Sequence, residues 1–241
     1  FHACHMGVTA ENVAREYGIT REDQDRLAVE SHRRAARAIA EGRFDEQVVP
    51  VEVTTRKGTV TFTGHEHVRP DVDLDALARL KPAFDRDGTV TAGNASGIND
   101  AAAAVVLADR DVAERRGLRP LARLVSYGFA GVEPRIMGVG PVPAVRAALD
   151  KAGLKVDDLD VIEANEAFAA QALAVIRELG LPEDRTNPNG SGVSLGHPVG
   201  ATGAILTVKA LYELQRVDGR YALITMCIGG GQGIAAVIER L

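Results

Sequence analysis

A cysteine near the C-terminal end of the sequence combines the residue types that acyl transfer needs. Cys227 closes an apolar run that starts at Tyr221, and Gly229-Gly-Gly231 follows. A thiol can attack or exchange protons with a thioester, and glycines let backbone N–H groups approach a ligand and stabilise an oxyanion. The pattern therefore suggests acyl chemistry at Cys227. An isolated cysteine at a strand end is more often a small core residue, so that alternative stays open.

Two other polar residues lie on loops that suit catalysis. His197 stands in Gly196-His197-Pro198, within a glycine-rich loop that leads into an apolar helix at 204–214. Pro198 disfavours helical backbone at His197, and a nearby helix N-terminus disfavours the imidazolium, which keeps a neutral base available. Asn165 joins a strand to a helix, where capping of the helix alone would explain it.

The elements that must position these residues alternate between strands and helices. Apolar runs predict strands at 121–127, at 160–164 and on both sides of the C-terminal glycine turn, and amphipathic runs predict helices at 142–152, 167–179 and 204–214. Such alternation is typical of an α/β fold.

The first half of the chain is less regular. We expect a solvated surface helix at 21–41, which a capping box of Thr20 and Asp23 begins. Alternating residues between 48 and 67 predict a hairpin with its turn at Arg56-Lys-Gly58. Short helices are predicted at 74–80 and 111–116, and the alanine-rich run at 101–108 reads as a buried strand or helix.

Composition excludes several function classes. The 241 residues are 46% hydrophobic with a net charge of −5, which argues against a nucleic-acid partner. No apolar run approaches the roughly 20 residues of a membrane span, and two distant cysteines favour a reducing, cytoplasmic setting. No targeting peptide is visible, although one upstream of Phe1 could have been lost. No second pair of metal ligands with zinc spacing follows His2, Cys4 and His5, so we expect no metal site.

Together the motifs carry a family resemblance. Asn165-Glu-Ala-Phe168, Gly196-His197-Pro198 and Cys227-Ile-Gly-Gly-Gly231, in this order and near these separations, resemble the three C-terminal active-site motifs of the thiolase family, in particular its acetyl-CoA acetyltransferases. Earlier stretches agree with it, namely His5-Met-Gly7, Arg79-Leu-Lys-Pro-Ala-Phe84 and Thr91-Ala-Gly-Asn-Ala-Ser-Gly97. The resemblance covers essentially the whole chain but only the later part of a thiolase.

The resemblance implies a thiolase-like layered αβαβα fold, present here as the C-terminal half plus a loop subdomain. Residues 1–97 would be the loop subdomain on the coenzyme A-binding side. Residues 98–120 would be the last strand and helix of the N-terminal thiolase half, and 121–241 the C-terminal half. In this arrangement 101–108 is a strand buried on both faces, whose neighbours lie in the missing half.

The implied reaction is the Claisen condensation of two acetyl-CoA molecules to acetoacetyl-CoA and coenzyme A, or the reverse thiolysis. His197 would accept the proton of a nucleophilic cysteine, and Cys227 would remove one from the methyl carbon of the second acetyl group. Asn165, through an ordered water, and His197 would polarise one carbonyl, and the Gly229 N–H would stabilise the other oxyanion. Hydrogen bonds suffice for the enolate, so neither metal nor cofactor is expected.

The resemblance also implies a surface that binds the coenzyme A thioesters. Arg69 suits the nucleotide phosphates because a guanidinium pairs well with them. The full set assigned to substrate is His5, Met6, Arg69, Phe84, Ala92, Ser96, Met137, Ala167 and Phe168. The full-length form is expected to be a homo-oligomer.

One departure is serious, because the nucleophilic cysteine has no counterpart. The only other cysteine, Cys4, stands in the wrong context, so we expect the chain to be a fragment. Three alternatives stay open. The first is a degradative 3-ketoacyl-CoA thiolase, the second a cysteine hydrolase built from Asn165, His197 and Cys227, and the third a non-catalytic acyl-CoA-binding remnant.

Overall fold

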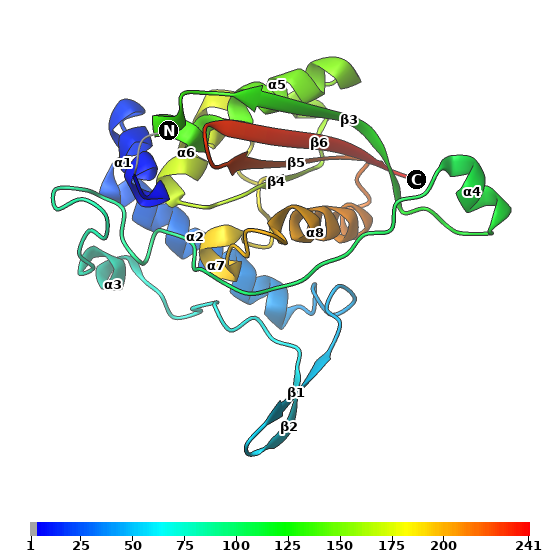
Figure 1. Ribbon diagram of the computed structural model, residues 1–241, viewed down its shortest axis with the longest axis horizontal. Helices are drawn as coiled ribbons and strands as arrows, with labels where there is room; N and C mark the ends of the chain where they lie inside the picture. Colours follow the sequence, from blue (N-terminus) through cyan, green and yellow to red (C-terminus); the bar gives the residue numbers. More distant parts are fainter. Residues whose placement is uncertain (1–3) are drawn as a thin grey trace.

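A four-stranded mixed sheet forms the centre of the molecule (Figure 1). The computed structural model describes residues 4–241, so positions 1–3 of the predicted loop subdomain lie outside the described residues. The strands are β3 (Ala122–Gly131), β4 (Val161–Ala164), β5 (Tyr221–Ile228) and β6 (Gln232–Arg240), in the order β3-β6-β5-β4. β5 pairs parallel with β4 and antiparallel with β6. All four strands were predicted.

Helices cover both faces of the sheet at β4 and β5. α5 (Pro141–Ala152) and α6 (Ala169–Leu179) share one apolar cluster with Leu223, and α8 (Thr202–Arg216) shares another with Ala222 and Ile224. Successive residues of a strand point to opposite faces, so β5 contributes to both clusters and is buried on both sides. The result is a three-layer α/β arrangement with the predicted helices.

Local sequence signals set the helix ends. α5 and α6 each stop at a glycine in the left-handed conformation, Gly153 (φ 65°) and Gly180 (φ 62°), where a side chain would be strained. α2 (Arg21–Ala40) begins with the predicted capping box, in which the Thr20 side chain accepts from the Asp23 N–H. These boundaries could therefore be predicted from the sequence.

The prediction that α2 is a solvated surface helix is wrong for one of its faces. α2 packs against α6 and against α7 (Gly192–Leu195). Its small residues Ala28 and Ala35 are fully buried, and so are Gln24 and Ser31. The polar residues Gln24 and Ser31 can be buried on this face because their side chains hydrogen-bond to partners far along the chain.

The remaining N-terminal elements surround this core. α1 (Met6–Glu16) packs against the 3-10 helix η1 (Pro134–Val139), and a second 3-10 turn, η2 (Val156–Asp158), precedes β4. The predicted hairpin is present as β1 (Val51–Thr55) and β2 (Gly58–Phe62), extends away from the body and is exposed along both strands (Figure 1). None of the described helices meets the length and apolarity that crossing a bilayer demands.

The prediction of a buried strand at 101–108 is wrong. That segment has no regular structure and is exposed, with Val106 91% and Leu107 88% accessible. It runs as a long connection to α4 (Arg110–Arg115) (Figure 1). A strand requires a hydrogen-bonded neighbour, and none of the described strands lies beside this segment. The short helices are confirmed, as α4 and α3 (Leu74–Ala78).

β3 has an apolar face that no described helix covers. Ser126 and Gly128 are buried towards α5, whereas Leu124, Tyr127 and Phe129 are exposed on the strand. α8 packs mainly on β4 and β5, and Ala122 at the start of β3 packs against its cluster. An exposed edge strand with aromatic and aliphatic side chains favours association.

We predict that the chain expressed alone aggregates because of this face. Phe129→Ser should lower the aggregated fraction of the isolated chain, measured by size-exclusion chromatography. In the thiolase-length protein, meaning this chain preceded by the N-terminal half that the resemblance implies, the same change should lower the thermal midpoint, because the side chain would then be buried. Val217→Ser, at the end of α8, is the control and should do neither. An unchanged aggregated fraction for the isolated Phe129→Ser chain, or an unchanged thermal midpoint for the thiolase-length variant, would contradict the prediction.

Candidate functional site

Cys227 lies at the edge of the sheet where β5 turns into β6. It pairs with Gly233 across the two strands and is buried. Gly231 must be glycine, because its φ is 90° and a Cβ there would lie 2.3 Å from the Val132 carbonyl oxygen. A Cβ on Gly229 would meet nothing within 4 Å, so the space beside this predicted oxyanion donor is open.

The thiol of Cys227 lies in an apolar environment. Met137, Ala167 and Phe168, three of the predicted substrate-binding residues, pack around it. Burial raises the pKa of the Cys227 thiol to about 12, because an apolar environment disfavours the thiolate. In the unliganded chain Cys227 is therefore protonated at neutral pH.

His197 lies in the loop before α8, and both ring nitrogens have close neighbours. Nδ1 is 2.7 Å from Thr202 Oγ1, and Nε2 is 3.4 Å from Asn165 Nδ2. Its backbone N–H donates to Asn99 Oδ1 at 3.3 Å. Burial lowers the pKa of His197, so the imidazole is neutral as predicted, with desolvation as the cause.

Asn165 follows β4 and is almost fully buried. Its backbone N–H donates to the Thr225 carbonyl of β5 at 3.0 Å. The capping alternative is wrong, because α6 begins at Ala169 with Phe168 as its N-cap. Asn165 Oδ1 has no hydrogen-bond partner among the described residues. A buried acceptor without a partner is costly, which favours a polar ligand at this position.

The residue after Asn165 is held by a buried network that the sequence reasoning missed. Glu166 accepts from Ser31 Oγ of α2 at 2.6 Å and from Asn187 Nδ2 at 3.1 Å. Burial raises the pKa of Glu166. The Asn187 side chain also bonds both backbone groups of Ala164. The run Asn187-Pro-Asn-Gly was the available sequence signal for a structured turn here. Asn187 has a left-handed φ of 50°, which asparagine tolerates.

A second missed contact fixes the glycine-rich loop. Lys209 Nζ of α8 lies 2.6 Å from Glu163 Oε2 of β4 and donates to the Gly190 carbonyl at 2.6 Å. Both side chains are buried, and burial raises the pKa of Glu163 to about 7. Sequence reasoning had no signal for this pair, because lysine and glutamate are usually surface residues.

Three more predicted binding residues, His5, Phe84 and Ser96, lie on a surface next to Cys227. His5 stacks on Phe84 with ring centroids 4.7 Å apart, and Phe84 meets Phe168 edge-on at 6.0 Å. The Ser96 N–H donates to the Ala167 carbonyl at 3.0 Å. This surface continues the apolar lining of the thiol.

Three predicted residues do not join that packing. Met6 and Ala92 are exposed, the former at the first position of α1. Arg69 is exposed as well, and its backbone N–H donates to His32 Nδ1 of α2 at 3.1 Å. Their side chains are therefore free to meet a ligand, but the described contacts do not connect them to the thiol.

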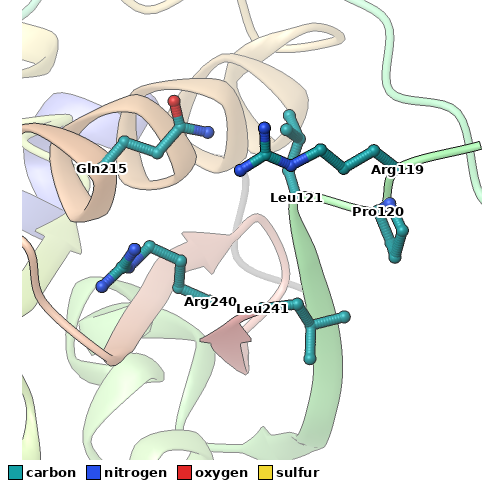
Figure 2. A pocket seen from close by; sticks show the side chains of 6 residues that line it. All are labelled: Arg119, Pro120, Leu121, Gln215, Arg240 and Leu241. Carbon is teal, nitrogen blue, oxygen red and sulfur yellow. The ribbon is translucent and has the colours of Figure 1, made fainter.

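A separate hollow lies at the far end of the sheet (Figure 2). Its volume is about 300 Å³, and its lining is Arg119, Pro120, Leu121, Gln215, Arg240 and Leu241. Tyr221, at the start of β5, pairs with Glu239 beside this hollow, whereas Cys227 is near the other end of the strand. None of the predicted site residues lines it. Within residues 4–241 no cluster of three metal-ligating side chains exists, and His2 lies outside the described residues.

The fold and the three motifs together define a class of protein. The thiolase C-terminal domain profile matches residues 118–240, and the thiolase N-terminal domain profile matches residues 1–111. The chain therefore belongs to the thiolase family. The match at 1–111 means that residues of the N-terminal domain are present in the chain.

Particular relatives agree with this assignment. The chain is 67% identical over its whole length to "Beta-ketothiolase BktB" of Cupriavidus necator and 56% identical to "Acetyl-CoA acetyltransferase" of Escherichia coli. Among solved structures it resembles Bacillus anthracis acetyl-CoA acetyltransferase with a TM-score of 0.98 at 51% identity, covering all of this chain. A human mitochondrial 3-ketoacyl-CoA thiolase in complex with CoA gives a TM-score of 0.90 at 43% identity over 98% of this chain.

The chain spans only part of these relatives. It covers 61% of the length of the Cupriavidus and Escherichia proteins, 61% of the Bacillus structure and 59% of the human one. The activity and substrates of a complete thiolase are therefore matters for proposal.

The buried thiol should react slowly with alkylating agents. We predict that iodoacetamide at about pH 8 modifies Cys4, which is partly exposed, at least roughly tenfold faster than Cys227, because the thiolate is the reactive form. Peptide mass spectrometry over time measures both rates. Equal rates at the two cysteines would show that the Cys227 thiol is neither protonated nor shielded.

The buried ion pair should matter for stability. Lys209→Met leaves Glu163 without its partner, so the thermal midpoint of the thiolase-length protein should fall by roughly 5 °C or more. Arg26→Met, which removes an exposed pair with Glu22 on α2, should shift it by less than about 2 °C. The loss should be smaller at about pH 5 than at about pH 8, because Glu163 then takes up a proton. Equal shifts for the two variants would contradict this reading.

Proposed function

We propose that the chain is the greater part of a thiolase-type acyltransferase, which condenses two acetyl-CoA molecules to acetoacetyl-CoA and coenzyme A or catalyses the reverse thiolysis. The observation that carries the proposal is the position of Cys227, His197 and Asn165 around one edge of the sheet. The names of the relatives support the same class of substrate.

Each of these residues has a role that its environment suits. Cys227 exchanges a proton with the α-carbon of the acetyl group. His197, neutral and half-buried, accepts the proton of the attacking thiol. Asn165, whose Oδ1 has no partner among the described residues, holds a water that polarises a thioester carbonyl, and the Gly229 N–H stabilises the second oxyanion.

The protonated form of Cys227 suits the proton-donating step of the thiolysis direction. Cleavage of a 3-ketoacyl thioester leaves a carbanion on the acetyl α-carbon, and a protonated thiol can supply the proton. Burial raises the Cys227 pKa to about 12, which makes this thiol a full proton donor at neutral pH. In condensation the same proton moves the other way, from the acetyl α-carbon to the Cys227 thiolate.

The nucleophile of the first step must come from outside the described site. The chain has two cysteines, and Cys4, which directly precedes the start of α1, does not stand in the sequence context of the nucleophile. We propose a cysteine in the N-terminal half of a thiolase-length protein. The same proposal includes the layered αβαβα arrangement and subdomain limits at residues 97 and 120. It also includes a homo-oligomeric state and a cytoplasmic setting.

The alternative functions make distinct demands on the site. A hydrolase needs His197 to hydrogen-bond the attacking thiol, yet the described contacts of His197 go to Thr202, Asn165 and Asn99. This favours a proton-carrying role for Cys227.

A degradative 3-ketoacyl-CoA thiolase would use the same residues as an acetyl-CoA acetyltransferase. Comparing turnover of acetoacetyl-CoA with that of longer 3-ketoacyl-CoA thioesters separates these two functions.

The first functional prediction concerns Cys227 in the thiolase-length protein. Cys227→Ala should leave acetylation of the upstream cysteine largely intact and abolish carbon–carbon bond formation, because only the proton carrier of the second step is lost. Radiolabelled acetyl transfer measures the first step and acetoacetyl-CoA formation the second. Near-normal condensation by the variant would overturn the assignment. Coenzyme A binding without turnover by the unsubstituted thiolase-length protein would favour the non-catalytic alternative.

A second functional prediction concerns His197. His197→Asn should slow both half-reactions by roughly 10²-fold or more, because the imidazole serves the nucleophile and a carbonyl oxygen. Val199→Asn, on an exposed position of the same loop, is the control and should change neither. Acetylation of the His197→Asn variant at the parent rate would rule out the dual role.

A further inference from the structure

The two nitrogens of His197 face different kinds of partner. Nδ1 is 2.7 Å from the Thr202 hydroxyl, and Nε2 is 3.4 Å from the Asn165 amide nitrogen. A neutral imidazole has one ring proton, and the nitrogen without it is the acceptor. The partners therefore determine whether Nε2 takes up a proton or donates one.

The Thr202 hydroxyl has only one proton to donate. Its Oγ1 lies 2.9 Å from the Pro198 carbonyl oxygen, and a carbonyl can only accept. With the hydroxyl proton directed at Pro198, Oγ1 presents a lone pair to His197. The contact at 2.7 Å is then a hydrogen bond only if Nδ1 carries the ring proton.

The other side of the ring makes the same demand. Asn165 Nδ2 is a donor without lone pairs to offer, so a proton on Nε2 would set two donors against each other. Thr202 is 3% exposed and begins α8, and His197 is further held by its backbone bond to Asn99. Water therefore has little access to the contact between Thr202 and Nδ1 of His197.

We propose that Thr202 is a positioning residue that locks His197 in the Nδ1–H tautomer and so makes Nε2 the proton acceptor. The consequence for reaction rests on the proposed function. As a thiol sulfur bonds to the thioester carbonyl carbon, the carbonyl π pair moves to oxygen and the thiol proton passes to Nε2. The resulting imidazolium donates Nε2–H to the oxyanion, and the departing thiolate takes that proton when the carbonyl re-forms.

This assignment orders the two roles of His197. Nε2 cannot donate to a carbonyl oxygen until it has taken up the proton of the nucleophile, so the imidazole acts as a base first and as a hydrogen-bond donor second. Loss of the Thr202 hydroxyl would let the proton move to Nε2, where it blocks the first step. Burial also lowers the pKa of His197, so the neutral ring is the form present before reaction.

Solid-state NMR of the thiolase-length protein labelled with ¹⁵N-histidine tests the tautomer directly. The difference from a His197→Asn sample assigns the His197 signals. We expect a protonated Nδ1 and an unprotonated Nε2 in the parent protein and in Thr202→Ser, which keeps the hydroxyl. Thr202→Val, of nearly the same shape, should show protonated Nε2 in a substantial fraction. A parent spectrum with protonated Nε2, or an unchanged tautomer in Thr202→Val, would overturn the proposal.

Kinetics provide the functional readout. Thr202→Val should lower kcat of thiolysis by roughly 10-fold to 100-fold with little change in KM, and Thr202→Ser should restore it, because the tautomer and not binding is altered. If Thr202→Val does not fold, the parent spectrum and Thr202→Ser still decide. If the thiolase-length protein shows the Nδ1–H tautomer but no acyl transfer, the proposed function fails while the role of Thr202 stands.

Discussion

The parallel pairing of β4 with β5 is the constraint on which the site depends. Ala164 pairs with Thr225, and the Asn165 N–H continues the ladder to the Thr225 carbonyl. Parallel strands end at the same edge of a sheet, so Asn165 and Cys227 arrive together although 62 positions separate them along the chain. β6 then adds the glycine turn to that edge. A slip of one residue in this pairing would turn Cys227 to the other face.

Buried charge keeps the loops around this edge in place. Burying a carboxylate is costly unless hydrogen bonds or an opposite charge compensate. Glu166 meets this demand with Ser31 and Asn187, and Glu163 does so with Lys209. Each carboxyl group is therefore stable in the interior only when the neighbouring loops place its hydrogen-bond or charge partners beside it. The loop that holds His197 is bounded by Asn187 at one end and by α8 at the other, so the same bonds that neutralise the acids restrict where the imidazole lies.

Local signals made much of the fold predictable. Strand periodicity, the Thr20 capping box and the glycine turn depend on neighbouring residues and appear in the structure where the sequence indicates them. The strand at 101–108 was wrong because an apolar run becomes a strand only beside a partner. The buried face of α2 was missed because Ser31 and Glu166 are 135 residues apart. The motifs identified Cys227, His197 and Asn165. The contact between Thr202 and His197, from which the tautomer of the imidazole is inferred, came only from three-dimensional geometry.

The central claim is that Cys227 moves protons at the α-carbon of an acetyl thioester. Solvent deuterium incorporation into the methyl group of acetyl-CoA, followed by mass spectrometry with the thiolase-length protein, tests it most directly. The account predicts steady incorporation by the parent protein and only the uncatalysed background with Cys227→Ala. Equal incorporation by the two proteins would contradict it and would move the proton transfer to another residue.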